Sequence, residues 1–151
     1  MEKLKVTDKR LIKSIFVNRE IEYVWHLWST PEGLQRLLGI DSKIELRPFG
    51  AYELYFLPDA EKGLKGSEGC QVLSFIPNEM LSFTWNAPPN METVRNHEYK
   101  TWVVLTFKKI DDKQTLVELI HLGWPEGKLW DEAYDYFDQS WGYVFDRMTK
   151  V

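Results

Sequence analysis

His121 is the residue in this sequence whose type and surroundings best suit chemistry. Val117 and Leu119 precede it at steps of two, so in a β-strand the three side chains share one face, which we expect to be buried. A buried imidazole needs a hydrogen-bond partner, and it can orient a ligand or act as a general acid or base. The alternative is a structural histidine near the rim of a cavity. The sequence leaves the partner open among Tyr134, Tyr136 and Glu98.

The other candidate groups lack the spacing of a known reaction centre. His26 lies in a predicted helix, where a surface or boundary position is expected, and His97 lies in a long loop. Cys70 is the only cysteine, which excludes an internal disulfide, fits a reducing compartment and favours a structural thiol. The sequence contains no glycine-rich phosphate loop, Cys-x-x-Cys pair, His-Glu-x-x-His motif or Gly-x-Ser-x-Gly motif. We therefore expect no metal, no cofactor and no catalytic residue, with His121 as the candidate if the protein is an enzyme.

Aromatic residues make up 15 % of the chain, more than a small core usually requires. They form either a plain core or the wall of an apolar cavity with a few polar groups, the usual composition of a small-molecule site. The cavity interpretation predicts a ligand-binding set on the inward faces of the strands and the last helix. That set is Tyr52, Leu54, Phe56, Phe83, Trp85, Leu105, Phe107, Leu119, His121, Tyr134, Phe137 and Trp141.

A long helix and a sheet are needed to hold these side chains. Residues 128–150 predict one helix, because apolar residues recur there at steps of three and four. Residues 20–28 and 30–38 predict two short helices, the second begun by Thr30 and Pro31 and ended by Gly39. The apolar face of the long helix comprises Leu129, Ala133, Phe137, Trp141, Val144, Phe145 and Met148.

Most of the remaining chain alternates apolar and polar residues, the pattern of β-strands. Strands are predicted at 11–18, 43–47, 51–57, 67–76, 80–85, 102–110 and 115–124. Short turns join consecutive strands, so the sheet should be antiparallel, and its apolar face needs the long helix as a cover. Residues 86–100 form one long irregular segment, of a length at which loops tend to be functional or mobile. The predicted fold is α+β, with a curved antiparallel sheet of about six to seven strands around the C-terminal helix.

Length, charge and hydropathy narrow the class of protein. In 151 residues without a linker or repeat we expect one domain over 1–151, with 1–10 as a loose N-terminal segment. The net charge of −4 and the lack of a basic stripe argue against nucleic acid as a partner. No apolar run approaches the ~18 residues of a membrane span, and the polar N-terminus lacks a signal-peptide core, so we expect a cytoplasmic location.

Five short motifs follow one another along residues 11–150. They are Val24-Trp25 with Ser29-Thr30-Pro31-Glu32-Gly33-Leu34, Phe49-Gly50, VLSFIPNEMLSFTW at 72–85, His121-Leu122-Gly123-Trp124, and Ser140-Trp141 with Val144 and Met148. In this order they resemble the SRPBCC superfamily (START-like or birch-pollen-allergen-like proteins) and, within it, the heat-shock protein 90 ATPase activator homologue family. In the last motif Ser140 replaces the usual glycine, and Phe145 adds bulk.

The resemblance implies a helix-grip fold with a cavity between the sheet and the long helix. In the superfamily that cavity holds lipids, sterols, polyketides or plant hormones, whereas the activators that name the family bind a chaperone. We therefore expect a binding protein that holds an apolar or aromatic small molecule there. The alternatives are a co-chaperone-like module that binds a chaperone, and a cyclase or hydrolase that uses His121. No residue argues for a particular oligomer, although a homodimer is common among such small domains.

Overall fold

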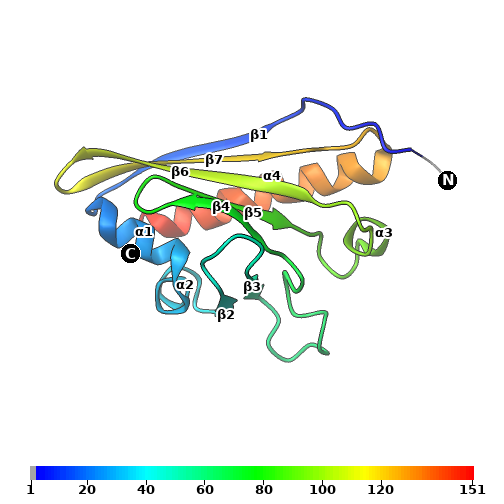
Figure 1. The fold of residues 1–151 in the computed structure, drawn as a ribbon, viewed down its shortest axis with the longest axis horizontal. Coiled ribbons are helices and arrows are strands. Elements are labelled where there is room, and N and C mark those ends of the chain that lie inside the picture. Colours follow the sequence, from blue (N-terminus) through cyan, green and yellow to red (C-terminus); the bar gives the residue numbers. More distant parts are fainter. Residues whose placement is uncertain (1–2) are drawn as a thin grey trace.

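The computed structural model describes residues 3–151, and its elements follow the predicted order (Figure 1). In chain order they are β1 (Leu11–Val17), α1 (Ile21–Ser29), α2 (Pro31–Leu38), β2 (Asp41–Ile44), β3 (Tyr52–Tyr55), β4 (Val72–Ile76), β5 (Met80–Trp85), α3 (Glu92–Arg95), β6 (Thr101–Asp111), β7 (Gln114–Leu122) and α4 (Lys128–Met148). The short helix α3 lies in the segment that the sequence predicts as irregular.

Within residues 3–151, seven strands form two antiparallel sheets. The larger sheet has five strands in the order β1-β7-β6-β5-β4, and β2 pairs with β3. β1 pairs with the last strand, with Leu11 opposite His121. The small sheet adjoins the edge of the large one through backbone hydrogen bonds, such as that from the Phe49 N–H to the Val72 carbonyl at 2.8 Å. Figure 1 shows α4 running along the large sheet, and the predicted helix-grip fold is confirmed.

The two short helices begin and end within one residue of the predicted positions. Thr30 caps α2 by accepting a hydrogen bond from the Gly33 N–H at 3.0 Å, and Gly39 ends the helix in the left-handed conformation, with φ of 68°. Gly33 also lets α1 and α2 approach closely, because a Cβ atom there would lie 1.9 Å from the His26 carbonyl oxygen. The helix pair therefore depends on the absence of a side chain at this position.

α4 buries one face of the helix in the core. Its buried residues are Trp130, Ala133, Phe137, Trp141, Val144, Phe145 and Met148. The sequence places Leu129 on this face, and that assignment is wrong, because Leu129 is 48 % exposed and Trp130 is buried instead. Trp130 packs against His97 and Tyr99, with ring centroids 5.7 and 6.0 Å apart. The first turn of α4 is thus positioned by the segment between α3 and β6.

His121 is fully buried and joins the sheet to α4 through two hydrogen bonds. Trp141 of α4 donates from Nε1 to Nδ1 of His121 at 3.1 Å, and Nε2 of the imidazole lies 2.7 Å from the Thr101 hydroxyl on β6. An indole nitrogen can only donate, so Nδ1 is unprotonated and Nε2 carries the proton. The imidazole is therefore a neutral connector between strand and helix.

Both partners of the imidazole are uncharged. Neither belongs to the set that the sequence leaves open, which was Tyr134, Tyr136 and Glu98. Burial lowers the pKa of His121 to about 3, because no opposite charge among the described residues offsets the cost of a positive charge in the core. His121 stays neutral at physiological pH.

Replacing Gly33 with alanine should destabilise the protein, because the new methyl group would overlap the backbone of α1. We expect the free energy of unfolding, measured by urea denaturation, to fall by about 2–3 kcal/mol. Gly142→Ala on α4 is the matched control, since a Cβ atom there meets nothing within 4 Å. The control should raise the free energy of unfolding by up to about 1 kcal/mol. Equal effects of the two substitutions would contradict the close approach of α1 and α2.

Removing the imidazole of His121 should flatten the dependence of stability on pH. The pKa of His121 is about 3 in the folded protein, against 6.5 as its ordinary value. Below pH 6.5 the unfolded state therefore binds one more proton, and stability falls as the pH falls. In the wild type this adds up to about 1.4 kcal/mol per pH unit to the loss of stability between about pH 5.5 and pH 4. His121→Gln should lack this contribution in urea denaturation, and an unchanged slope would argue against a neutral buried imidazole.

Candidate functional site: an aromatic groove beside the long helix

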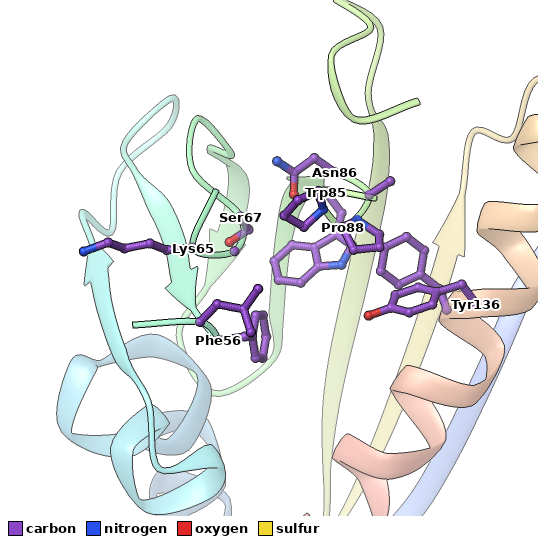
Figure 2. Close-up of a pocket in the computed structure, with 12 residues that line it drawn as sticks. Phe56, Lys65, Ser67, Trp85, Asn86, Pro88 and Tyr136 are labelled. Carbon is purple, nitrogen blue, oxygen red and sulfur yellow. The ribbon is translucent and has the colours of Figure 1, made fainter. Parts of the chain in front are cut away.

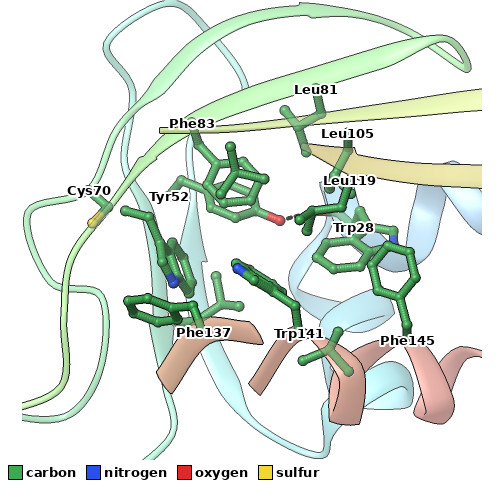
Figure 3. Close-up of a cluster of buried hydrophobic side chains, with 14 of the residues drawn as sticks. Trp28, Tyr52, Cys70, Leu81, Phe83, Leu105, Leu119, Phe137, Trp141 and Phe145 are labelled. Carbon is green, nitrogen blue, oxygen red and sulfur yellow. Dashed lines mark hydrogen bonds between the residues drawn. The ribbon is translucent and has the colours of Figure 1, made fainter. Parts of the chain in front are cut away.

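Aromatic side chains fill much of the space between the sheet and α4. Tyr52 stacks on Phe83 with ring centroids 4.2 Å apart, and the Tyr52 hydroxyl donates to the Trp28 carbonyl oxygen at 2.7 Å. Trp141 of α4 packs against Trp85 and Trp28, with centroids 5.3 and 6.5 Å apart. Figure 3 shows the rings of Tyr52, Phe83 and Trp141 converging from the strands and from α4. The inner wall of the grip is therefore mainly packed core.

An open groove lies at one edge of this core, between α4 and the segments that follow β3 and β5; we call it the α4 groove. It consists of two adjoining pockets of about 310 and 150 Å³, which share Phe56, Trp85, Tyr136 and Phe137. Figure 2 shows the smaller pocket. The larger pocket is also lined by Leu38, Ser140, Trp141, Tyr143 and Val144, and the smaller one by Leu57, Lys65, Gly66, Ser67, Asn86, Ala87, Pro88 and Pro89.

The aromatic lining has a buried floor and an exposed rim. Trp85 and Phe137 are buried, whereas Phe56 and Tyr136 are each 42 % exposed and Tyr143 is 64 % exposed. Figure 2 shows the indole of Trp85 between Phe56 on one side and Tyr136 on the other. A bound molecule would therefore cover exposed rings at the rim while it touches buried rings at the floor.

Four of the twelve ligand-binding residues predicted from the sequence line this groove: Phe56, Trp85, Phe137 and Trp141. Six others lie in the core, each at most 1 % exposed: Tyr52, Leu54, Phe83, Leu105, Leu119 and His121. Phe107 packs against Trp25 with centroids 5.4 Å apart, and Tyr134 packs against Trp124 at 5.3 Å. The alternation of apolar and polar residues correctly predicts which strand side chains point inward. Most of those side chains contact other core residues and do not line the groove.

Sequence reasoning missed several residues of the groove. Tyr136, Ser140 and Tyr143 come from the side of α4 next to the core stripe, and Leu38 comes from the end of α2. The spacing of Tyr136 and Tyr143, seven residues apart, puts both on one helix face and was an available signal. No feature of the neighbouring sequence indicates that Leu38 lines the groove, because its position depends on how α2 packs against the rest of the protein.

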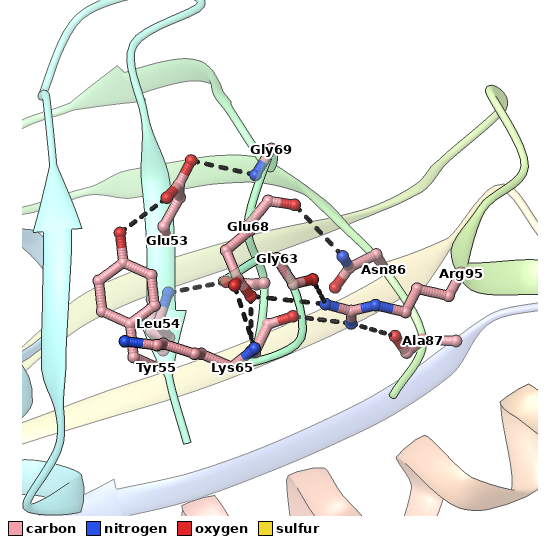
Figure 4. Close-up of polar contacts among 12 residues, drawn as sticks. Glu53, Leu54, Tyr55, Gly63, Lys65, Glu68, Gly69, Asn86, Ala87 and Arg95 are labelled. Atoms are coloured by element: carbon pink, nitrogen blue, oxygen red, sulfur yellow. Dashed lines mark hydrogen bonds and ion pairs between the residues drawn. The ribbon is translucent and has the colours of Figure 1, made fainter. Parts of the chain in front are cut away.

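Arg95 ties the two walls of the smaller pocket together (Figure 4). Its buried guanidinium donates to the carbonyl oxygens of Gly63, Gly66 and Ala87 at 2.7, 2.8 and 2.7 Å. It also lies 3.4 Å from the carboxylate of Glu68. The loop between β3 and β4 is thereby held against the segment that follows β5, which gives the predicted irregular segment a structural role.

The carboxylate of Glu68 is satisfied mainly by the backbone. Partial burial acts to raise the pKa of Glu68, but the N–H groups of Lys65 and Gly66 donate to its oxygens at 3.0 and 2.7 Å and hold the pKa below its ordinary value. Burial lowers the pKa of Lys100, whose ammonium group donates to the Arg95 carbonyl. These charges stabilise the loops and do not line the groove.

The groove itself carries little charge. Apart from its tyrosines, Lys65 is the only ionisable residue within 3–151 that lines either pocket, and it belongs to the smaller one. Burial raises the pKa of the Cys70 thiol to about 12, so this thiol stays protonated.

Within residues 3–151 no three His, Cys, Asp or Glu side chains gather in a way that could hold a metal ion. No helix in this range has the length and apolar character needed to cross a membrane.

The fold is shared with several solved structures. Protein MLL2253 from Mesorhizobium loti is 16 % identical with a TM-score of 0.71, over 94 % of this chain and 95 % of that one. An HSP90 activator from Plasmodium falciparum is 14 % identical with a TM-score of 0.67, over 90 % and 89 %. The Aha1 dimer from Colwellia psychrerythraea is 16 % identical with a TM-score of 0.63, over 93 % of each chain. At such identities the similarity is one of fold alone.

The sequence itself gives the family. No curated protein matches it significantly. Residues 18–151 match the model of a family described as Activator of Hsp90 ATPase homolog 1-like protein. The matched range includes every element that lines the α4 groove. The resemblance seen in the short motifs is thereby confirmed, and the chain belongs to the family of activator of Hsp90 ATPase homolog 1-like proteins.

Proposed function

We propose that this protein binds a compact apolar or aromatic small molecule in the α4 groove. The observation that carries the proposal is an aromatic lining around an open volume of about 310 Å³. Small-molecule sites are typically concave, mostly apolar and roughly 300–1,000 Å³ in size, so this groove falls at the lower end of the range. A compact ring system suits it better than a long-chain lipid.

The exposed rings at the rim supply a driving force for binding. Phe56, Tyr136 and Tyr143 leave apolar surface in contact with water in the free protein. Each ~100 Å² of apolar surface that a ligand covers contributes about 2.5 kcal/mol before the costs of association are counted. The floor adds the faces of Trp85 and Phe137, which offer stacking or edge-to-face contacts to a flat ring.

The chemistry of the groove favours binding over catalysis. His121, the candidate general acid or base, lies in the core with both ring nitrogens in hydrogen bonds to Thr101 and Trp141. The Cys70 thiol is buried and protonated and does not belong to the lining. Among residues 3–151 no carboxylate lines either pocket, so these residues offer no paired acid and base within reach of a ligand.

Tyr136→Ala should weaken binding of the neutral fluorescent probe N-phenyl-1-naphthylamine. Loss of the ring removes apolar contact at the rim, and we expect the Kd from fluorescence titration to rise about tenfold. Tyr134→Ala is the matched control two residues away on α4, because the Tyr134 ring packs against Trp124 and Lys9 outside the groove. The control should leave the Kd within about twofold. No saturable binding to the wild type, or equal effects of the two variants, would contradict the proposal.

A second candidate function is binding of a chaperone, favoured by the family match. The loop between β3 and β4 exposes Leu57 and Leu64, at 51 % and 40 %, beside the rim of the groove. Exposed apolar side chains grouped in this way are typical of surfaces that bind another protein. A homodimer stays a prediction, in line with the Aha1 structure from Colwellia psychrerythraea, which is a dimer.

The chaperone candidate predicts that adding this protein raises the ATPase rate of purified Hsp90 from the same organism. Leu57→Ser should reduce the stimulation at least about fivefold, because it removes an apolar contact at the loop. Ile12→Ser on β1 is the matched control, since Ile12 is similarly exposed at 55 % but lies on the far edge strand of the large sheet. An ATPase rate that does not respond to the wild-type protein would remove this candidate.

A further inference from the structure

Trp85 has an indole N–H group that no other residue satisfies. Of the other buried tryptophans, Trp28, Trp124 and Trp141 donate from Nε1 to protein atoms at 3.4, 2.9 and 3.1 Å. Trp130, at 8 % exposed, also lacks a partner for Nε1 within residues 3–151, but it does not line the groove. Trp85 is only 5 % exposed, yet its Nε1 donates no hydrogen bond within residues 3–151. Buried indole N–H groups normally find a partner, because an unmet donor costs about 1–3 kcal/mol.

This N–H group opens into the α4 groove. Within the described residues, the only side-chain nitrogen or oxygen that is both fully enclosed and unpartnered is Oγ of Ser42. Nε1 of Trp85 therefore keeps contact with open space, and Trp85 lines both pockets of the groove. Figure 2 shows the indole near the centre of the residues that line the smaller pocket.

We propose that the Trp85 N–H is the polar anchor of the groove and selects flat aromatic molecules that carry an uncharged hydrogen-bond acceptor, such as a carbonyl oxygen. This inference rests on the proposed function, since it names the chemical class of the ligand. A ligand carbonyl would satisfy the free donor, whereas a pure hydrocarbon would leave it unpaired in an apolar site. Of two aromatic molecules of equal size and shape, the groove should therefore bind the one with a carbonyl oxygen more tightly than the one without it.

The charge of the surroundings favours an uncharged acceptor. In the part of the chain that the structure describes, no Lys, Arg, Asp or Glu lines the larger pocket, and Lys65 belongs to the smaller pocket alone. A carboxylate brought against the indole would lose hydration in aromatic surroundings without a nearby ion-pair partner. A carbonyl group loses less hydration and gains the same hydrogen bond.

The direction of the N–H is fixed by packing. The indole of Trp85 is held by Trp141, Phe83 and Phe56, with ring centroids 5.3, 5.4 and 6.4 Å away. Trp141 is itself held by its hydrogen bond to His121. A donor held in this way needs little further ordering when a ligand binds, so more of the hydrogen-bond energy appears as affinity.

The test compares 2-acetylnaphthalene with 2-ethylnaphthalene, which are similar in size and differ in the carbonyl oxygen. Each displaces N-phenyl-1-naphthylamine in a competition titration. The wild type should bind the ketone about fivefold to tenfold more tightly than the hydrocarbon. Trp85→Phe keeps an aromatic ring without the N–H and should abolish this ratio. Trp102→Phe is the matched control, because Trp102 pairs with Thr84 and so faces the opposite side of the sheet, and it should preserve the ratio.

A second measurement needs no variant. In the wild type labelled with ¹⁵N-tryptophan, saturating ketone should shift the indole proton of Trp85 downfield, and the hydrocarbon should not. Saturable binding of the ketone and the hydrocarbon to the wild type with equal Kd would contradict the role of the Trp85 N–H as polar anchor. So would a difference in Kd between the two molecules that persists in Trp85→Phe. Either result would leave the proposed function standing. If neither molecule displaces the probe and the probe itself does not bind, both the polar anchor and the proposed function are contradicted.

Discussion

The hydrogen bond from Trp141 of α4 to His121 of β7 joins the helix to the sheet, and the position of the groove depends on it. The contact requires an uncharged imidazole, and burial together with the Thr101 hydroxyl maintains that state. Because the N–H of Trp141 is directed into the core, its ring is left to line the groove and to pack against Trp85. One buried polar contact thus orients the aromatic floor of the site.

The groove lies at the edge of the grip because the centre is occupied by side chains. Tyr52 and Phe83 stack where a deeper cavity would otherwise continue, and the hydroxyl of Tyr52 is bonded to the backbone of Trp28. At the edge, Arg95 binds three carbonyl oxygens and holds a loop of the chain against the segment after β5. A packed centre and a tied loop together leave open space beside α4, with aromatic walls on both sides.

Family membership and the site answer different questions about this protein. Relatives of 14–16 % identity share its fold over about nine tenths of their length, and one of them is described as an HSP90 activator. A shared fold does not fix function, which depends on the groups that line a site. Here those groups come from β5, the end of α2, both the buried and the exposed side of α4, and two loops. The loops are the parts of a fold that vary most readily.

The sequence by itself determined the order of elements, the capping of α2 by Thr30 and Gly39, the inward face of the strands and the family. These follow from local periodicity, turn chemistry and short motifs. The tertiary structure alone decided that His121 bonds Thr101 and Trp141, and that Trp85 rather than His121 presents a free donor to the groove. Periodicity tells which way a side chain points, but partners and open space depend on how distant segments pack, and that is set by the whole chain.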